Sequence, residues 1–396
     1  MSKIILFLII GIDAFILFFQ TTQLSISYSE ANILYGHNSF LQLLVKYSIQ
    51  LFGNNNFGLH FIMIICHLLS VLLIYAISKK YVTQERNRLW LILTFVLLPG
   101  VISSALVLNT AGIIIFGLLL FVYLFDKIPQ VWLNIVLFIY SFIDHGFAYL
   151  FLALSVYYFS QKKYMQMVYL LFLYALNSYA YGFYIYGLPR GHFLDVIGVY
   201  SAIFTPIIFI YLFYNLYRRY LTNEINFIWY LSAIPLILSL VLSFRQRVEI
   251  EYFASYLILA LPLAAQSFVS SYRVRLKEHR TGYKIVFIFS FIFLISNAVL
   301  VNLNKTLYMF LDNPKQHFAY KMHVAKELAT ILKKRNINCI STDEKMQLRL
   351  RFYKIYQCNQ YTLRELPLNT KEMGNVTVSY KDKILYKANV TIINNI

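Results

Sequence analysis

The sequence predicts an all-helical polytopic membrane bundle that carries a small water-soluble α/β domain at its C-terminal end. Of the 396 residues, 59% are hydrophobic and only 13% are charged, and the mean hydropathy of +0.61 is far above that of soluble globular domains. Apolar runs, many of them close to the roughly 20 residues that cross a bilayer, recur over the first three quarters of the chain. The last quarter has none, so the fold class changes there.

The apolar runs predict about eleven membrane-spanning helices. The first run follows Lys3 and lacks a small-residue cleavage pattern after it, so we expect an uncleaved membrane anchor. Asp13 lies inside this run, where an acid either has a functional role or hydrogen-bonds a neighbouring helix. The predicted spans are residues 4–19, 57–77, 89–108, 112–125, 131–143, 147–159, 164–176, 200–217, 227–244, 252–268 and 285–303.

The formal net charge of the chain is +18, and many of the basic residues lie in short loops between the apolar runs. This distribution indicates the orientation of a membrane protein and excludes a DNA-binding face. Alternation of eleven spans puts most loop cations on the side of the N-terminus, which is then cytoplasmic. The loop 20–56, the loop 177–199, the turn 245–251 and the C-terminal tail fall on the outer side. The cations that share the inner side are Lys79, Lys80, Arg86, Arg88, Lys127, Lys162, Lys163, Arg218, Arg219, Arg273, Arg275, Lys277 and Arg280.

The outer loop 20–56 is too long and too patterned to be a plain connector. Residues 39–52 predict an amphipathic helix that lies at the membrane surface, and residues 27–34 predict a short helix that contains Glu30. The apolar face of the first of these helices consists of Phe40, Leu43, Leu44, Tyr47 and Leu51.

The chain divides by composition into a transmembrane domain, 1–303, and a soluble domain, 304–396. In the tail we predict helices at 317–334 and 343–352, strands at 337–340 and 353–358, and a hairpin of 376–380 with 384–386. Cys339 and Cys358 are the only cysteines outside the membrane part, and an oxidising compartment would allow a disulfide between them. Two buried free thiols are the alternative.

Tyr28-Ser29-Glu30-Ala31 soon after the first helix, then Leu51-Phe52-Gly53 and the helix 57–77, resemble a known family. The pattern is similar to that of the polyprenyl-phosphate-dependent membrane glycosyltransferases of the GT-C fold, such as the lipid A aminoarabinose transferases and the protein O-mannosyltransferases. The resemblance covers residues 4 to about 268. It implies a GT-C-like bundle in a bacterial inner membrane, with a periplasmic first loop and tail. A lipid-linked sugar is then a substrate, and no cofactor is expected.

Three positions depart from that family pattern. The family begins its first-loop motif with Asp-Glu, whereas this chain has Ser29-Glu30. Ala111 follows Thr110 where an aspartate is usual, and His145-Gly146-Phe147 replaces Lys-Gly-Pro. These departures leave open a non-catalytic relative that binds the carrier lipid and assists a partner.

Sugar transfer from a lipid phosphate requires a carboxylate as general base and cations that stabilise the departing phosphate. Glu30 is the candidate base, and its alternative role is to cap or solvate a loop helix. Asp144 and His145 at an outer helix end are candidates for substrate binding, with helix capping as the alternative for Asp144. The candidate phosphate ligands on the outer side are Lys46, Arg190, Arg245 and Arg247, for which anchoring to anionic lipid is the alternative. His192, a further candidate for substrate binding, lies with Arg190 in a turn-rich stretch that could approach a headgroup closely.

The histidines lack metal-ligand spacing, and neither a metal nor a nucleic-acid partner is expected. The expected partners are a polyprenyl-phosphate sugar and membrane lipid, and protein partners are unknown. The function that fits best is a membrane glycosyltransferase. A transporter or flippase of a lipid-linked sugar is the alternative, but such proteins tend to contain repeats and broken helices, which the sequence does not indicate.

Overall fold

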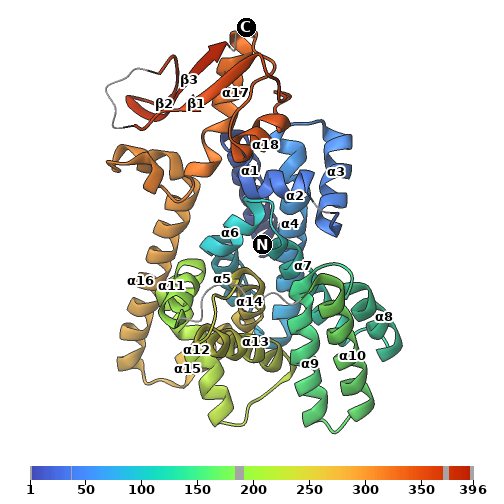
Figure 1. The fold of residues 1–396 in the computed structure, drawn as a ribbon. Helices are drawn as coiled ribbons and strands as arrows, with labels where there is room; N and C mark the ends of the chain where they lie inside the picture. Colours follow the sequence, from blue (N-terminus) through green and yellow to red (C-terminus); the bar gives the residue numbers. More distant parts are fainter. Residues whose placement is uncertain (1, 37, 183–190, 369–373, 393–396) are drawn as a thin grey trace. The chain divides into compact units, whose positions relative to one another are not determined.

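A computed structural model of the chain describes residues 2–36, 38–182, 191–368 and 374–392. It is mostly helical, with a small three-stranded sheet near the C-terminus (Figure 1). Its internal contacts divide the chain into two compact units. We call Met1–Phe15, Met63–Ala105 and Asn109–Ala298 the helical unit, and Ile16–Ile62, Leu106–Leu108 and Val299–Ile396 the loop-tail unit.

The loop-tail unit joins the first outer loop to the tail, although the two lie more than two hundred residues apart in sequence. Whether residues 304–396 fold as a separate domain, as the composition predicts, stays a prediction.

Most helices belong to the helical unit. α1 (Ser2–Gln23), α4 (Asn56–Tyr81) and α16 (Lys277–Asn302) continue into the loop-tail unit, and the last residue of α6, Leu106, also lies there. The others are α5 (Glu85–Leu97), α6 (Pro99–Leu106), α7 (Thr110–Phe125), α8 (Gln130–Tyr140), η1 (His145–Phe147), α9 (Ala148–Ser160), α10 (Tyr164–Tyr181), α11 (Phe193–Phe204), α12 (Pro206–Leu221), α13 (Phe227–Ser243), α14 (Ile250–Leu257), η2 (Ile258–Ala260) and α15 (Leu261–Val274).

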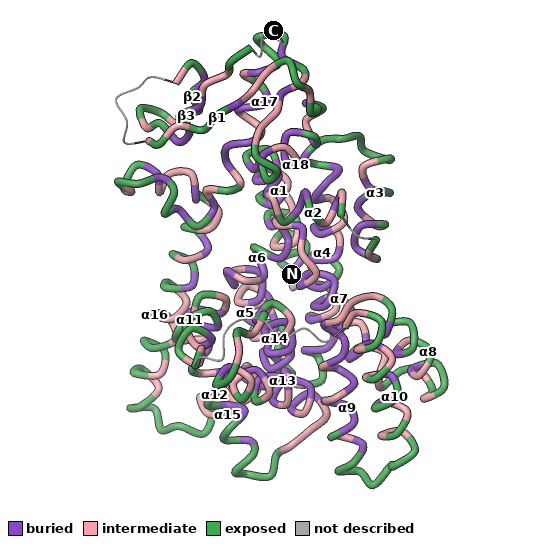
Figure 2. Tube along the Cα trace, viewed as in Figure 1, coloured by how far each residue is buried: buried purple, intermediate pink, exposed green. Residues whose placement is uncertain are grey.

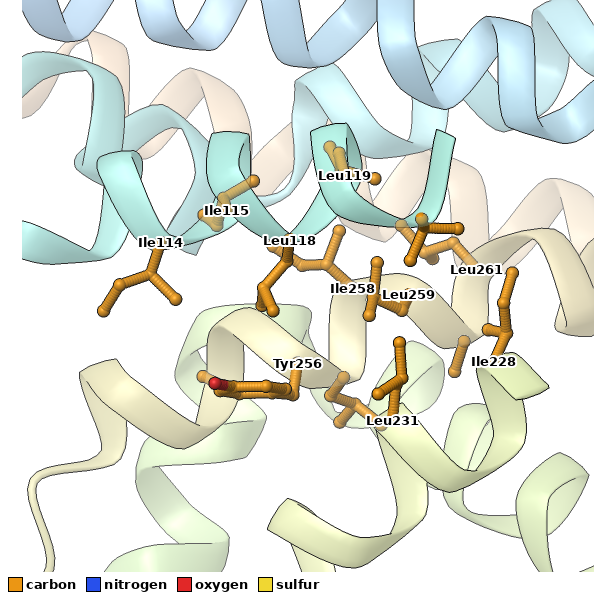
Figure 3. Packing of buried hydrophobic residues seen from close by; sticks show 14 of the residues in the cluster. Ile114, Ile115, Leu118, Leu119, Ile228, Leu231, Tyr256, Ile258, Leu259 and Leu261 are labelled. Atoms are coloured by element: carbon orange, nitrogen blue, oxygen red, sulfur yellow. The ribbon is translucent and has the colours of Figure 1, made fainter. Parts of the chain in front are cut away.

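The core of the helical unit is formed where α7 packs against α14 and η2. Ile114 and Leu118 of α7 lie beside Tyr256 and Ile258, and α13 contributes Leu231 from the other side (Figure 3). α7 is almost entirely apolar and most of its residues are buried, which is expected of a helix surrounded by other helices. The exposed residues gather on the outer helices and on the connecting turns (Figure 2).

Apolar helices of spanning length confirm that the chain is a membrane protein. Four described helices are long and apolar enough to cross a bilayer, or six if two bent pairs each count as one span. Only 11% of the apolar window of α16 is buried, and side chains such as Phe289 and Ile292 are exposed along it. Lipid is the solvent that tolerates so long an uncovered apolar helix. The count of eleven spans stays a prediction.

Two predicted spans are interrupted, so the expectation of unbroken helices was wrong. Residues 89–108 contain a 58° bend between α5 and α6, and residues 200–217 contain a 107° bend between α11 and α12. Pro99 and Pro206 begin the second helix of each pair. Proline disfavours helical geometry in the residue before it, and Leu98 and Thr205 are accordingly non-helical.

The first outer loop contains the two predicted helices, α2 (Tyr28–Tyr35) and α3 (Phe40–Phe52). α3 buries Leu41, Val45 and Ser48 on one side. Its predicted apolar face is largely uncovered, which suits a helix that lies on a membrane surface. The strongly exposed residues of that face are Phe40, Leu43, Tyr47 and Leu51, and Leu44 is half-buried.

In the tail, the predicted hairpin is confirmed as β2 (Val376–Tyr380) and β3 (Lys383–Ile392), which pair in antiparallel register. The sequence analysis missed β1 (Tyr361–Glu365), which pairs with the other edge of β3 to give the order β1-β3-β2. Val376 and Val378 pack on α17 (Ala325–Lys334) and α18 (Glu344–Phe352).

Other tail predictions need correction. The helix expected over 317–334 begins only at Ala325, because the 3-10 turn η5 (Tyr320–Met322) occupies the start of that range. Two more 3-10 turns come earlier in the tail, η3 (Asn304–Met309) and η4 (Pro314–Gln316). The strands expected at 337–340 and 353–358 are reduced to an isolated parallel bridge between Cys339 and Tyr356. A nine-residue helix, α18, is a short crossover for a parallel pair, which limits how far the ladder extends.

The predicted disulfide between Cys339 and Cys358 is confirmed. Their Cα atoms are 5.4 Å apart, within the range that a disulfide requires. The bridge therefore fixes both ends of the α18 crossover within the loop-tail unit.

Candidate functional site

Glu30 lies at the start of α2, where the sequence Ser27-Tyr-Ser-Glu30 forms a capping box. The Glu30 N–H donates to Ser27 Oγ at 3.3 Å, and the Ser27 N–H donates to Glu30 Oε2 at 2.7 Å. Each of the two residues thus satisfies a backbone donor at the helix start. The capping role weighed in the sequence analysis is what the structure shows.

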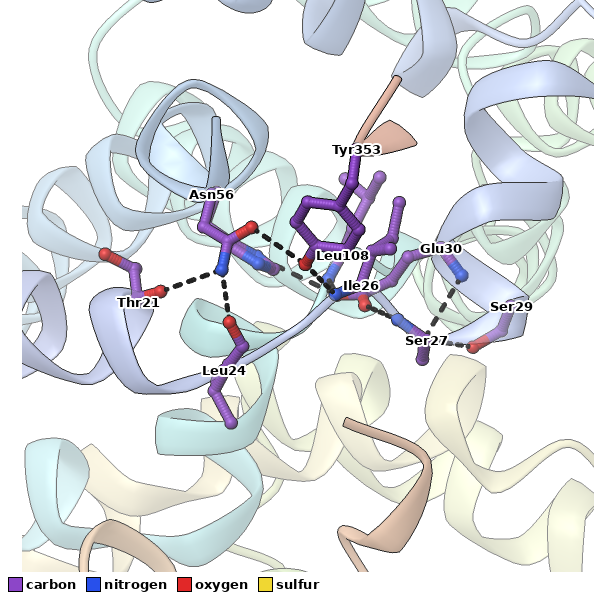
Figure 4. A network of polar contacts seen from close by, with 10 residues as sticks. Thr21, Leu24, Ile26, Ser27, Ser29, Glu30, Asn56, Leu108 and Tyr353 are labelled. Atoms are coloured by element: carbon purple, nitrogen blue, oxygen red, sulfur yellow. Dashed lines mark hydrogen bonds and ion pairs between the residues drawn. The ribbon is translucent and has the colours of Figure 1, made fainter. Parts of the chain in front are cut away.

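The second oxygen of Glu30 has a distant partner. The Leu108 N–H donates to Glu30 Oε1 at 2.8 Å, from the connection between α6 and α7 (Figure 4). His60, in the first turns of α4, places its Nδ1 3.8 Å from the same oxygen. Both side chains are only 1% exposed, and neither ring nitrogen of His60 has a hydrogen-bond partner among the described residues. A buried imidazole without partners beside a carboxylate is a candidate functional residue.

The segment that leads into α2 is held by the tail. The Ile26 N–H donates to Tyr353 Oη at 3.1 Å, and that hydroxyl donates to Asn56 Oδ1 at 3.2 Å (Figure 4). Arg349 is buried and its Nε donates to the Ile26 carbonyl at 3.1 Å. Asn56 also donates from Nδ2 to the Leu24 carbonyl. Glu30 is therefore positioned by residues from three separate stretches of sequence.

Chemically, the Glu30 carboxylate retains acceptor capacity. Two backbone N–H groups occupy two of its roughly four lone-pair positions, so a further hydrogen-bond donor can still bind. Because the side chain is buried, it can accept a proton only from a group that enters its immediate surroundings.

A second cluster forms in the helical unit at the turn between α8 and α9. Asp144 caps η1 by accepting from the Gly146 N–H at 2.7 Å, and Asn177 Nδ2 donates to the Asp144 carbonyl at 3.1 Å. Burial and the charge of Glu249 raise the pKa of the Asp144 carboxyl to about 6. Burial lowers the pKa of His145. The cluster therefore combines a proton-accepting imidazole with an acid that is partly protonated at mildly acidic pH.

Gly146 is the one family position retained at this turn, and packing explains why. A Cβ atom there would lie 2.3 Å from Ile114 Cδ1 and 3.0 Å from Tyr252 Cδ1. The Gly146 carbonyl also accepts from Tyr256 Oη at 2.6 Å. Backbone and neighbouring helices approach too closely for a larger residue.

The candidate cations are placed separately. Lys46 is exposed on α3 in the loop-tail unit, whereas Arg245 and Arg247 are exposed in the turn after α13 in the helical unit. Arg190 lies outside the described residues. The His192 N–H donates to the Ser243 carbonyl at 2.7 Å, which brings this residue beside the turn that contains Arg245. The imidazole of His192 pairs with Asp195 at 3.2 Å.

The acid inside the first apolar run, Asp13, lies beside His67 of α4. Asp13 accepts from, or shares a proton with, His67 Nε2 at 2.7 Å, so it bonds a neighbouring helix as the sequence analysis allowed. No cluster of three or more potential metal-ligating residues occurs in the part of the chain that the structure describes.

Sequence reasoning missed His60, Asn56, Arg349 and Tyr353 around Glu30. His60 carried a weak signal, since a histidine within an apolar run is costly to bury without a purpose. Arg349 and Tyr353 carried none, because they reach the first loop from more than 300 residues away.

The fold of the whole chain is similar to that of one solved structure. The similarity is to the crystal structure of ArnT from Cupriavidus metallidurans in the apo state, with a TM-score of 0.56 over 98% of this chain and 97% of that chain. Their sequences are 10% identical, so the likeness shows the fold alone. No protein-family model matches the sequence, and neither does any curated protein sequence.

Proposed function

We propose that this protein transfers a sugar from a polyprenyl-phosphate carrier to an acceptor at the periplasmic face of a bacterial inner membrane. The observation that carries the proposal is the ArnT-like fold, which extends over 98% of the chain. A buried acid with spare acceptor capacity in the first outer loop supports it. In this proposal the N-terminus is cytoplasmic, and the first loop and the tail are periplasmic.

In the proposed reaction, an acceptor hydroxyl or amine attacks the anomeric carbon of the sugar. The bond between that carbon and the phosphate oxygen breaks, and the electron pair leaves with the phosphate. Glu30 takes the acceptor proton as general base. Its backbone donors hold the carboxylate in one orientation, which favours a defined proton path.

The departing phosphate needs positive charge. We assign this role to Lys46, Arg190, Arg245 and Arg247, and sugar binding to Asp144, His145 and His192. Lys46, Arg245 and Arg247 are exposed, so their ammonium and guanidinium groups are accessible to an incoming phosphate.

The test is Glu30→Gln, because the one amide oxygen of glutamine can still accept from the Ser27 N–H of the capping box while the base is removed. The Leu108 N–H loses its acceptor in this variant. Purified protein is reconstituted in vesicles with a panel of polyprenyl-phosphate sugars and a panel of hydroxyl and amine acceptors, and release of the free carrier phosphate is measured. We expect turnover to fall by roughly 10²- to 10⁴-fold. Glu344→Gln, at an exposed acid in the first turn of α18, is the matched control and should keep full turnover. Undiminished turnover in Glu30→Gln would remove Glu30 from the mechanism.

The bends at α5–α6 and α11–α12 are a reason to keep the transporter alternative, since broken helices are common in transporters. The same vesicles distinguish it. A transporter would move the carrier lipid between leaflets without cleaving it. A non-catalytic relative would bind the carrier and neither cleave nor move it.

A further inference from the structure

A cavity of about 340 Å³ opens in the loop-tail unit, at the level where two apolar helices end. α1 ends at Gln23 and α16 at Asn302, and Gln20 Nε2 donates to the Asn302 carbonyl at 2.6 Å. Both helices qualify as membrane spans. Gln23, just at the end of α1, and Lys305, just after α16, both line the cavity, which therefore lies at the height of lipid headgroups.

One face of α17 and the turn before it form the rest of the cavity. His323, Lys326 and Glu327 line it, together with Ser25 from the first loop. The Ser25 N–H donates to the Met322 carbonyl at 2.8 Å, which holds the serine beside His323. This backbone hydrogen bond thus fixes the position of Ser25 relative to His323 in the lining.

Two buried polar atoms in this lining have no partner among the described residues. They are Ser25 Oγ and His323 Nε2, and each residue is only 2% exposed. Unpaired buried polar atoms are costly, so such a pair indicates a ligand that supplies the missing hydrogen bonds.

The tautomer of His323 follows from its other nitrogen. Nδ1 lies 2.9 Å from Tyr308 Oη. Burial, Lys305 and His317 lower the pKa of His323 to about 3, and burial raises the pKa of Tyr308, so both groups are neutral at pH 7. If the phenol donates to Nδ1, the ring proton resides on Nε2, and this arrangement leaves the fewest groups unpaired. His323, which lines the cavity, then carries an unpaired N–H donor on Nε2.

The charges in the cavity favour an anion. Lys305 and Lys326 contribute two cations against one carboxylate, Glu327, which pairs with Lys305 at 3.4 Å. Lys326 donates to the Thr22 carbonyl at 2.6 Å, so its ammonium is anchored at the end of α1 and has donor hydrogens to spare. Two ammonium groups, one hydroxyl and one imidazole N–H suit the several acceptor oxygens of a phosphate group.

We propose that the cavity lined by Ser25, His323, Lys305 and Lys326 binds the headgroup phosphate of a membrane phospholipid. The position of the cavity indicates that the phosphate belongs to a lipid. Phe19 on α1 and Leu303 just after α16 are close in sequence to residues that line the cavity, and each is 55% exposed. Both side chains can therefore contact acyl chains. A free phosphate ion would leave these side chains uncovered. None of these four cavity residues has a role in the proposed glycosyltransferase mechanism. The lipid site can therefore be tested independently of that mechanism.

The test is native mass spectrometry of the full-length protein in detergent during titration with phosphatidylglycerol. Ser25→Ala removes a hydroxyl that has no partner in the part of the chain that the structure describes, and Lys326→Met removes one cation. Each should weaken phosphatidylglycerol binding by about tenfold, the expected effect of losing one hydrogen bond to a charged group. Lys334→Met, at the exposed end of the same helix, is the matched control and should bind as the unmodified protein does.

Two further arms separate the possible ligands. Diacylglycerol with the same acyl chains lacks the phosphate and should not be retained. Inorganic phosphate in the millimolar range should not displace phosphatidylglycerol. Unchanged affinity in both Ser25→Ala and Lys326→Met, or equal retention of diacylglycerol, would overturn the proposal. Displacement by inorganic phosphate would replace the lipid with a free ion and overturn the lipid assignment.

Discussion

Glu30 in the loop-tail unit and Asp144 in the helical unit both cap short helices, but different parts of the chain hold them. The Glu30 oxygens accept from Ser27 close by and from Leu108, 78 residues away. Asp144 accepts from Gly146, two residues away. The carboxylate of Glu30 is therefore held in part by a tertiary contact, whereas the carboxylate of Asp144 is bonded within its own turn.

The comparison extends to what surrounds each acid. Tyr353 and Arg349 of the tail bond the Ile26 backbone just ahead of α2. The tail is thus a structural support for the candidate base. The turn of Asp144 is supported from within the helical unit, where Asn177 donates to the Asp144 carbonyl and Tyr256 to the Gly146 carbonyl. Damage to the tail should therefore affect the two acids unequally.

Replacing Glu30 tests this difference most strongly. Glu30→Ala leaves the buried Ser27 and Leu108 N–H groups unpaired, which should lower the free energy of unfolding by roughly 2–6 kcal/mol at about 1–3 kcal/mol for each donor. Asp144→Ala leaves one N–H unpaired and should cost about 1 kcal/mol. Denaturant unfolding in detergent measures both. Equal losses would contradict the idea that Glu30 carries long-range contacts.

The disulfide offers the next largest effect, confined to the loop-tail unit. Cys339→Ser combined with Cys358→Ser opens a loop whose ends are 19 residues apart. The loss should be about 3 kcal/mol in the loop-entropy model. Dithiothreitol should shift the unfolding midpoint of the unmodified protein by a similar amount. Cys66→Ala is the control, since Cys66 is a buried free thiol and its variant should keep the sensitivity to reductant.

Much of the fold could be predicted from local sequence patterns. Three features depend on residues only a few positions apart. They are the spacing of apolar residues along α3, the capping box from Ser27 to Glu30, and the β2–β3 hairpin. Pro99 and Pro206 are a local signal for the breaks at α5–α6 and α11–α12, although the apolar runs around them predict continuous spans.

The rest could not be predicted, because it depends on contacts between distant residues. Nothing near Tyr353 indicates that its hydroxyl will bond Ile26, 327 residues away. β1 is a short strand whose partner is the far edge of β3, so its pairing becomes evident only in the folded sheet. His60 was set aside for lack of metal-ligand spacing, and only the structure places it beside Glu30.

His323 in the loop-tail unit and Asp144 in the helical unit should contribute to the pH dependence of stability with opposite signs. The pKa of His323 falls from 6.5 in the unfolded chain to about 3 in the fold, so only the unfolded state gains a proton between these values. Stability is therefore full above pH 6.5 and is lost as the pH falls, by at most about 1.4 kcal/mol per pH unit. His323→Gln should remove this loss in unfolding experiments at pH 4 to 7, and an unchanged slope would exclude His323 as its source.

Asp144 should show the reverse dependence. Its pKa rises from 3.8 to about 6 on folding, so the folded state holds the extra proton. Stability is present below pH 3.8 and is lost as the pH rises through about 6, again by at most about 1.4 kcal/mol per pH unit. Asp144→Asn should flatten this part of the stability curve between pH 4 and 6. A steeper curve in that variant would contradict the assignment.

Ser27→Ala should have the smallest effect and separates the two roles of Glu30. The substitution removes the hydroxyl that accepts from the Glu30 N–H, and the loss of one cap should cost about 1 kcal/mol. Asp343→Ala removes the comparable cap of α18, where Asp343 accepts from the Met346 N–H at 3.1 Å, and should cost a similar amount. Because the Ser27 N–H and the Leu108 N–H still orient the carboxylate, Ser27→Ala should keep turnover within a few-fold of the unmodified protein, whereas Glu30→Gln should lose it. If both variants lose turnover equally, Glu30 acts through the position of α2 and not as a base.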